Sequence, residues 1–192
     1  MKNKTNRAMP IKIAALIAAI VLVIGCTAGG TVAWLVSKPA AITNVFTVGN
    51  INAELAETKT AFKIVPGVDI DKDPVATVTA NSEDCYLFVK LTEENWPTFT
   101  EADNTTRKVK YEIAGGWTKL EDGVYYRVVT KSDTEDQSYP VLKDDKVTVS
   151  NTLTKENADA ITGDPKLTVA VYAVQKEGMG SAADAWETAK AN

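Results

Sequence analysis

The sequence predicts an all-β fold: an antiparallel β-sandwich, jelly-roll-like, with one or two short helices. Segments of alternating or continuous apolar residues recur between residues 50 and 174 and are rich in β-branched and aromatic side chains. Turn pairs separate these segments, among them Pro66-Gly67, Gly115-Gly116 and Asp164-Pro165. Short strands divided by such turns are typical of antiparallel sandwiches.

Seven or eight short strands are expected. They cover residues 50–55, 75–79, 85–91, 109–113, 117–120, 124–129, 146–149 and 167–174. Residues 121–123 (Glu-Asp-Gly) predict a hairpin loop with glycine in the left-handed conformation. Asp144 and Asp145, with a lysine on each side, predict another hairpin tip. Segment 167–174 (LTVAVYAV) is apolar on both faces, which predicts a central strand.

Two segments carry helix signals, residues 154–161 and residues 181–190. Thr154 and Ser181 precede them and are expected to be their N-caps. Gly49 interrupts a strand pattern, which predicts a bulge or a close approach of backbone. Residues 34–48 are weakly patterned and are expected to form an N-terminal arm, followed by a single β-sandwich domain over residues 49–192.

Residues 1–33 have the features of a signal peptide. Basic residues precede the uncharged run 13–25, which is shorter than the roughly 20 residues that span a bilayer. Small residues before Trp34 predict cleavage after Ala33, and hence an extracellular or cell-surface protein exported through the cytoplasmic membrane. Two alternatives stay open: residues 23–26 (VIGC) fit a lipobox with Cys26 as the lipidated residue, and the apolar run could remain as an anchor.

Composition excludes several classes of site. The chain has no histidine, so it has neither a Ser-His-Asp triad nor a His-ligated zinc site. The first 33 residues hold none of the 25 acidic residues, so the remainder is acidic and unsuited to nucleic acid. Cys85 alternates with apolar residues and is expected to be a small buried hydrophobe. No cofactor and no enzymatic activity are expected.

Three stretches together resemble the TasA/camelysin family of exported Gram-positive proteins, which a SipW-type signal peptidase processes. Residues 29–34 (GGTVAW) are similar to that family's cleavage region, and residues 44–51 (NVFTVGNI) to its opening strand. Residues 167–175, with residues 182–186, are similar to the ending of related secreted proteins. The resemblance implies a jelly-roll-like surface or biofilm-matrix component, with fibres in some members. It also implies protease activity, which no residue pattern here supports.

Three groups of side chains are candidate sites. Asp69, Asp71 and Asp73 alternate like the start of a calcium loop, but Pro74 and Ala80 stand where an EF-hand has glycine and glutamate. Only a looser Ca²⁺ site is left open. Four acidic residues flank Trp96 and Phe99, as carboxylates do in glycosidases: Glu93, Glu94, Glu101 and Asp103. Four aromatic residues could form a sugar-stacking face: Trp96, Trp117, Tyr125 and Tyr126.

The sequence therefore favours a secreted or surface structural protein, a self-assembling matrix or fibre subunit. Its expected partners are further copies of itself, other surface proteins and the signal peptidase. An assembly arm would carry the apolar residues Trp34, Leu35, Val36, Ile42 and Phe46. The alternative is a lipid-anchored binding module that recognises carbohydrate or protein.

Overall fold

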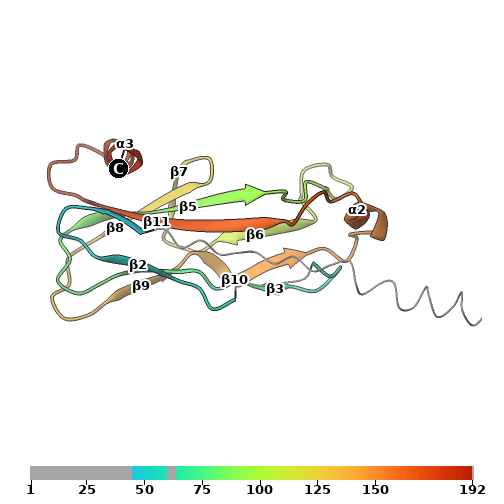
Figure 1. Cartoon of the computed structure of the whole chain (residues 1–192), viewed down its shortest axis with the longest axis horizontal. Helices are drawn as coiled ribbons and strands as arrows, with labels where there is room; N and C mark the ends of the chain where they lie inside the picture. Colours follow the sequence, from blue (N-terminus) through green and yellow to red (C-terminus); the bar gives the residue numbers. More distant parts are fainter. Residues whose placement is uncertain (1–44, 60–63, 192) are drawn as a thin grey trace, which may run out of the picture. The chain divides into compact units, whose positions relative to one another are not determined.

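The computed structural model describes residues 45–59 and 64–191, with side chains from residue 48 onward. These residues form mostly strands, in three sheets, with two short helices (Figure 1). The predicted all-β class is therefore confirmed. How the sheets close into a jelly-roll-like sandwich stays a prediction.

The largest sheet has five strands in the order β1-β11-β5-β8-β7. Their bounds are Val45–Val48, Lys166–Gln175, Cys85–Glu94, Val124–Val129 and Thr118–Glu121. β5 and β11 form its longest ladder, an antiparallel pairing of ten residues each that runs from Cys85 opposite Gln175 to Glu94 opposite Lys166. β1 pairs with the other edge of β11 and runs parallel to it.

The other strands form two three-stranded sheets, β3-β10-β6 and β2-β4-β9. The chain passes from one sheet to the other between β2 and β3, between β3 and β4, and between β9 and β10. The strands are β2 (Ala53–Ala56), β3 (Ile70–Asp71), β4 (Val75–Val78), β6 (Val109–Ile113), β9 (Gln137–Pro140) and β10 (Leu142–Val149). Val141 alone separates β9 from β10. Its amide donates to the Pro74 carbonyl and its carbonyl accepts from Ala114, so hydrogen bonding continues between the two sheets.

The five-stranded sheet buries apolar side chains on both faces. Successive residues of a strand point to opposite faces, and Leu87, Phe88 and Val89 of β5 are all 0% exposed. β11 is likewise buried through Val169, Ala170, Val171, Ala173 and Val174. Strands buried on both faces read as continuous apolar runs, which explains why segment 167–174 predicts a central strand. It has a strand on either side, as expected.

Helix α3 (Ala182–Lys190) covers one face of this sheet. Trp186 packs on Phe88 with ring centroids 5.3 Å apart and meets Tyr172 edge-on at 5.0 Å. Its indole N–H donates to Glu121 of β7 at 2.7 Å. β2 and β9 lie on the opposite side of β11 from α3 (Figure 1). The helix thus supplies the apolar cover that this face of the sheet needs.

Both helix starts match the sequence prediction. The Thr154 hydroxyl accepts from the Asn157 amide at 3.2 Å at the start of α2 (Lys155–Asp159), and the Asn157 side chain accepts from the Thr154 amide. The Ser181 hydroxyl accepts from the Asp184 amide at 3.2 Å at the start of α3. Each cap satisfies amides that have no partner within the helix.

Several strands differ from the sequence prediction. β3 and β9 were not expected, and β10 begins at Leu142 rather than at residue 146. β1 takes up the last four residues of the segment expected to be an arm, and lies within residues 44–51, which the family resemblance gives as an opening strand. The parallel pairing of β1 is also an exception to the predicted antiparallel arrangement.

Gly49 shows the close approach that its place in the strand pattern predicts. Its φ is +99°, and a Cβ there would lie 2.7 Å from Gln175 Oε1 and 2.8 Å from Gln175 Cβ. Ser82, which is buried, fixes the next turn because its hydroxyl accepts from the Asn52 amide at 3.1 Å. The chain therefore passes from β1 to β2 along a tightly packed path.

The turn between β7 and β8 gives the first testable prediction. Gly123 has φ +72°, and a Cβ there would lie 2.6 Å from the Leu91 carbonyl oxygen, a backbone atom with little freedom to move. We expect Gly123→Ala to lower the free energy of unfolding in urea by about 2 kcal/mol, from the left-handed backbone and the clash. Gly115→Ala is the matched control, because its Cβ would meet nothing within 4 Å. Equal stability of the two variants would contradict this packing.

Cys85 gives a second prediction. Its side chain is free and 0% exposed, as the sequence predicts, and burial followed by the charge of Asp84 raises its pKa to about 12. The folded protein should therefore react with a maleimide only as fast as it unfolds, since thiolate and access are both lacking. The measurement needs a chain without Cys26, and the urea-unfolded protein is the positive control. We expect Cys85→Ala to lower the free energy of unfolding by about 1–2 kcal/mol, because buried apolar contact is lost. Rapid labelling of the native protein would refute burial.

Candidate functional site

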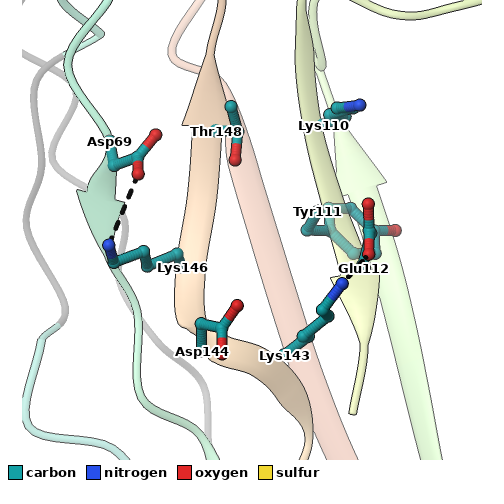
Figure 2. A pocket seen from close by; sticks show the side chains of 8 residues that line it. All are labelled: Asp69, Lys110, Tyr111, Glu112, Lys143, Asp144, Lys146 and Thr148. Atoms are coloured by element: carbon teal, nitrogen blue, oxygen red, sulfur yellow. Dashed lines mark hydrogen bonds and ion pairs between the residues drawn. The ribbon is translucent and has the colours of Figure 1, made fainter.

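A polar cleft of about 160 Å³ crosses the sheet formed by β3, β10 and β6 (Figure 2). We call it the bulge cleft. Its lining residues come from all three strands or the residues beside them: Asp69, Lys110, Tyr111, Glu112, Lys143, Asp144, Lys146 and Thr148. Most are exposed and only Lys110 and Tyr111 are half-buried. The cleft is therefore a surface feature of the sheet and not an enclosed cavity.

The cleft owes its shape to an irregularity inside β10. Leu142 pairs with Ile113 and Val147 with Tyr111, so β10 has three more residues than β6 between these pairs. The extra residues bulge out of the ladder, and Asp144 and Asp145 both adopt positive φ, at 56° and 53°. Such backbone is uncommon for residues other than glycine, although Asp and Asn tolerate it best. The Asp-Asp pair expected at a hairpin tip is thus a bulge within one strand.

Two ion pairs cross the bulge cleft. Lys143 Nζ lies 2.8 Å from Glu112 Oε2, and Lys146 Nζ lies 3.4 Å from Asp69 Oδ2, as Figure 2 shows. The hydrogen bond from Lys143 lowers the pKa of Glu112, and the same bond raises the pKa of Lys143. Lys110 forms no ion pair with any described residue, but its charge also lowers the pKa of Glu112.

This arrangement does not favour general-acid catalysis by Glu112. A general acid at neutral pH needs a raised carboxyl pKa, whereas that of Glu112 is lowered. The cleft instead alternates positive and negative side chains across neighbouring strands, on a surface open to solvent. Such a pattern can recognise a partner of complementary charge, and exposed pairs of this kind contribute specificity more than affinity.

The acidic candidates beside the aromatic residues each have a structural partner. Glu93 accepts two hydrogen bonds from Arg107 Nη1, at 2.8 and 2.9 Å, and one from the Tyr111 hydroxyl at 3.0 Å. Burial, followed by the charge of Glu93, raises the pKa of Tyr111, so this hydroxyl stays protonated and donates. Glu94 pairs with Lys166 at 3.5 Å.

The other two acidic candidates stabilise loops. Asp103 accepts from the Thr105 amide, the Thr106 amide and the Thr106 hydroxyl, and these bonds, the hydroxyl's first, lower its pKa. Glu101 accepts from the Thr152 hydroxyl at 2.6 Å. The structure therefore assigns turn and strand contacts to these four carboxylates.

The three aspartates of the calcium candidate separate in the fold. Asp69 pairs with Lys146, and Asp73 accepts from the Thr58 and Lys59 amides at 3.0 and 2.9 Å. Asp71 is exposed on β3. Within residues 45–59 and 64–191, no group of three or more Cys, Asp or Glu side chains is arranged to hold a metal ion.

The aromatic candidates do not share a face. Trp96 is buried and meets Tyr111 edge-on at 5.8 Å, and its indole donates to the Val109 carbonyl. Tyr126 packs in the cluster under α3, while Tyr125, its neighbour on β8, points to the other face. Trp117 stacks on Arg127, two residues from Tyr125 on β8. Because Tyr126 points to the opposite face from Tyr125, the four residues do not form one stacking surface.

Trp117 belongs to a stack that the sequence did not reveal. The Arg127 guanidinium lies 3.6 Å from the centroid of the Tyr139 ring and 5.2 Å from that of Trp117. Arg127 is on β8 and Tyr139 on β9, so the stack connects two different sheets. Cation–π contacts contribute about 0.5–1 kcal/mol at exposed sites. No local pattern signals the stack, because its members come from separate segments.

The candidate residues near the N-terminus lie outside the described residues. These are Cys26, the cleavage pair Ala33 and Trp34, and the arm residues Leu35, Val36 and Ile42. Phe46 is the exception, and its backbone pairs with Tyr172 in the ladder between β1 and β11. Among the described residues, no helix is both long and apolar enough to cross a membrane.

Comparison with protein-family models, curated proteins and solved structures gives no match. The resemblance to the TasA/camelysin family stays a prediction from the sequence.

The bulge gives a third prediction. Asp144 is exposed at φ 56°, where a β-branched side chain is strongly disfavoured and glycine is relaxed. We expect Asp144→Val to lower the free energy of unfolding by about 1–2 kcal/mol, and Asp144→Gly to leave it unchanged or slightly raised. Urea unfolding of both variants measures this. If valine and glycine were tolerated equally, the bulge would not have the described backbone.

Proposed function

We propose that the chain is exported, cleaved between Ala33 and Trp34, and acts as a secreted or cell-surface structural protein that assembles with further copies of itself. The observation that carries this proposal is the position of β1. It is a four-residue strand at the edge of the five-stranded sheet, and it directly follows the segment that cleavage would free.

Edge strands offer unpaired backbone groups to other chains. Among the described strands, β1 pairs only with β11, through a parallel ladder from Val45 opposite Val171 to Val48 opposite Val174. A parallel pair is slightly less stable per residue than an antiparallel one. An apolar arm that continues from such an edge could add to the sheet of a neighbouring copy, with main-chain hydrogen bonds supplying affinity.

Head-to-tail addition of this kind supports fibres. The donor and acceptor surfaces differ, so the contact does not close on itself and can propagate. The apolar arm residues Trp34, Leu35, Val36 and Ile42 favour burial over exposure to water. Export would act as the trigger, because the uncleaved signal peptide holds the arm at the membrane.

A second candidate is a binding module that recognises a charged partner, and the bulge cleft favours it. The cleft combines an irregular, strained backbone with alternating charges on an exposed sheet face. Bulges are over-represented beside binding sites, where they redirect side chains. In this case the cleft would act on a partner at the surface, with no need for assembly.

The arm gives the fourth prediction. Mature protein beginning at Trp34 should form fibres visible by electron microscopy and should scatter light increasingly with time. Deletion of residues 34–44, which leaves β1 complete, should abolish both while circular dichroism shows the same β content. The reason is that the donor segment is lost and the acceptor sheet is kept.

A matched control separates the two candidates. The double variant Glu112→Lys, Lys143→Glu exchanges the charges of one ion pair in the bulge cleft and leaves the arm intact. Assembly should be unchanged in this variant. Fibres from the folded protein without residues 34–44 would rule out the arm. Loss of assembly on charge exchange alone would favour the bulge cleft as the interaction surface.

A further inference from the structure

One buried ion pair has no role in the functions discussed above. Lys72, between β3 and β4, is 1% exposed in its side chain, and Glu57, just after β2, is 4% exposed. Lys72 Nζ lies 2.5 Å from Glu57 Oε1. Among the described residues, Glu57 is the one hydrogen-bond partner of this amine. A pair so placed is costly, because the interior does not repay the hydration that both charges lose unless further hydrogen bonds satisfy them.

Hydrogen bonds fix the backbone beside each member of the pair. The Asp73 carboxylate accepts from the amides of Thr58 and Lys59, the residues that follow Glu57. The amide of Lys72 itself donates to the Asp145 carbonyl in the β10 bulge at 2.8 Å. These contacts fix the backbone beside both members of the pair.

We propose that Lys72 and Glu57 condense to an intramolecular amide, a covalent cross-link between the end of β2 and the β3–β4 connection. The proton of the ammonium first passes to the Glu57 carboxylate, which gives a neutral amine and a neutral acid. The lone pair of Nζ then attacks Cδ of Glu57. The C–O bond to the hydroxyl breaks, and the hydroxyl leaves with a second proton from nitrogen as water. One N–C bond replaces one C–O bond, and no oxidant or reductant is needed.

The contact brings the two reacting groups close together. A nitrogen in hydrogen-bonding contact with one carboxyl oxygen is close to the carboxyl carbon, in the separation range of a near-attack arrangement. Where two reacting groups are held in contact with their orbitals aligned, the effective concentration reaches roughly 10⁵–10⁸ M. The product carries no charge, so the cost of burying two ions is removed.

The test is the mass of the purified, denatured full chain, with its N-terminus determined on the same sample. We expect a mass lower than the sum of its residues by one water molecule, together with a branched protease fragment that joins the Lys72 peptide to the Glu57 peptide. Lys72→Arg keeps the positive charge but cannot form this amide, so its mass should equal the full sum. If that variant does not fold, the branched fragment of the wild-type chain alone decides the question.

Two results would overturn the proposal. One is a folded wild-type chain whose mass equals the full sum, which would show that the pair remains ionic. The other is loss of water in both the wild-type chain and Lys72→Arg, which would place the loss elsewhere. Cyclisation at the exposed Asp122-Gly123 turn is an example of such a loss, and it yields no branched fragment.

Discussion

The antiparallel ladder between β5 and β11 is the constraint on which the rest of the structure depends. Its two strands are ten residues each and are the longest in the described chain. β11 accepts β1 on its free edge, β5 accepts β8, and α3 follows β11 directly and packs back on the same sheet. Because β5 and β11 are far apart in sequence, their pairing has a high loop-closure cost, which burial of both faces must offset. Once this ladder has formed, it positions β1 beside β11 and β8 beside β5, and β8 in turn positions β7.

The remaining strands are organised differently, and the candidate features lie among them. β3, β4, β9 and β10 form two short ladders joined at Pro74 and Val141, with the bulge at Asp144 as the largest departure from regular pairing. The same bulge shapes the polar cleft and supplies the carbonyl that holds the backbone of Lys72. An irregularity in one strand thus determines both the exposed charged surface and the buried lysine beside it.

Sequence reasoning succeeded where the signal is local. Thr154 and Ser181 cap the helices as expected because a cap depends on residues three positions apart, and segment 167–174 is central because both of its faces are apolar.

Sequence reasoning failed where the residues or strands that interact are distant in sequence. β9 (QSYP) has no strand pattern and exists because β4 lies beside it, and the parallel pairing of β1 depends on a strand over 120 positions away. The Lys72–Glu57 pair was missed because neither residue lies in a predicted strand and the two are 15 positions apart. Tyr125 and Tyr126 are adjacent in sequence, but the strand turns them to different faces.

We infer that β5 and β11 form the permanent core of the domain and that β1 is an edge strand able to exchange partners. Native-state hydrogen exchange on the full chain, followed amide by amide, tests this most directly. The amides in the ladder between β5 and β11 should be the slowest to exchange, at rates set by global unfolding. Those in the ladder between β1 and β11 should exchange faster, through local release of β1. Protection of the β1 amides equal to that of β5 would contradict the account, because β1 would then be a fixed part of the core and unavailable to a neighbouring copy.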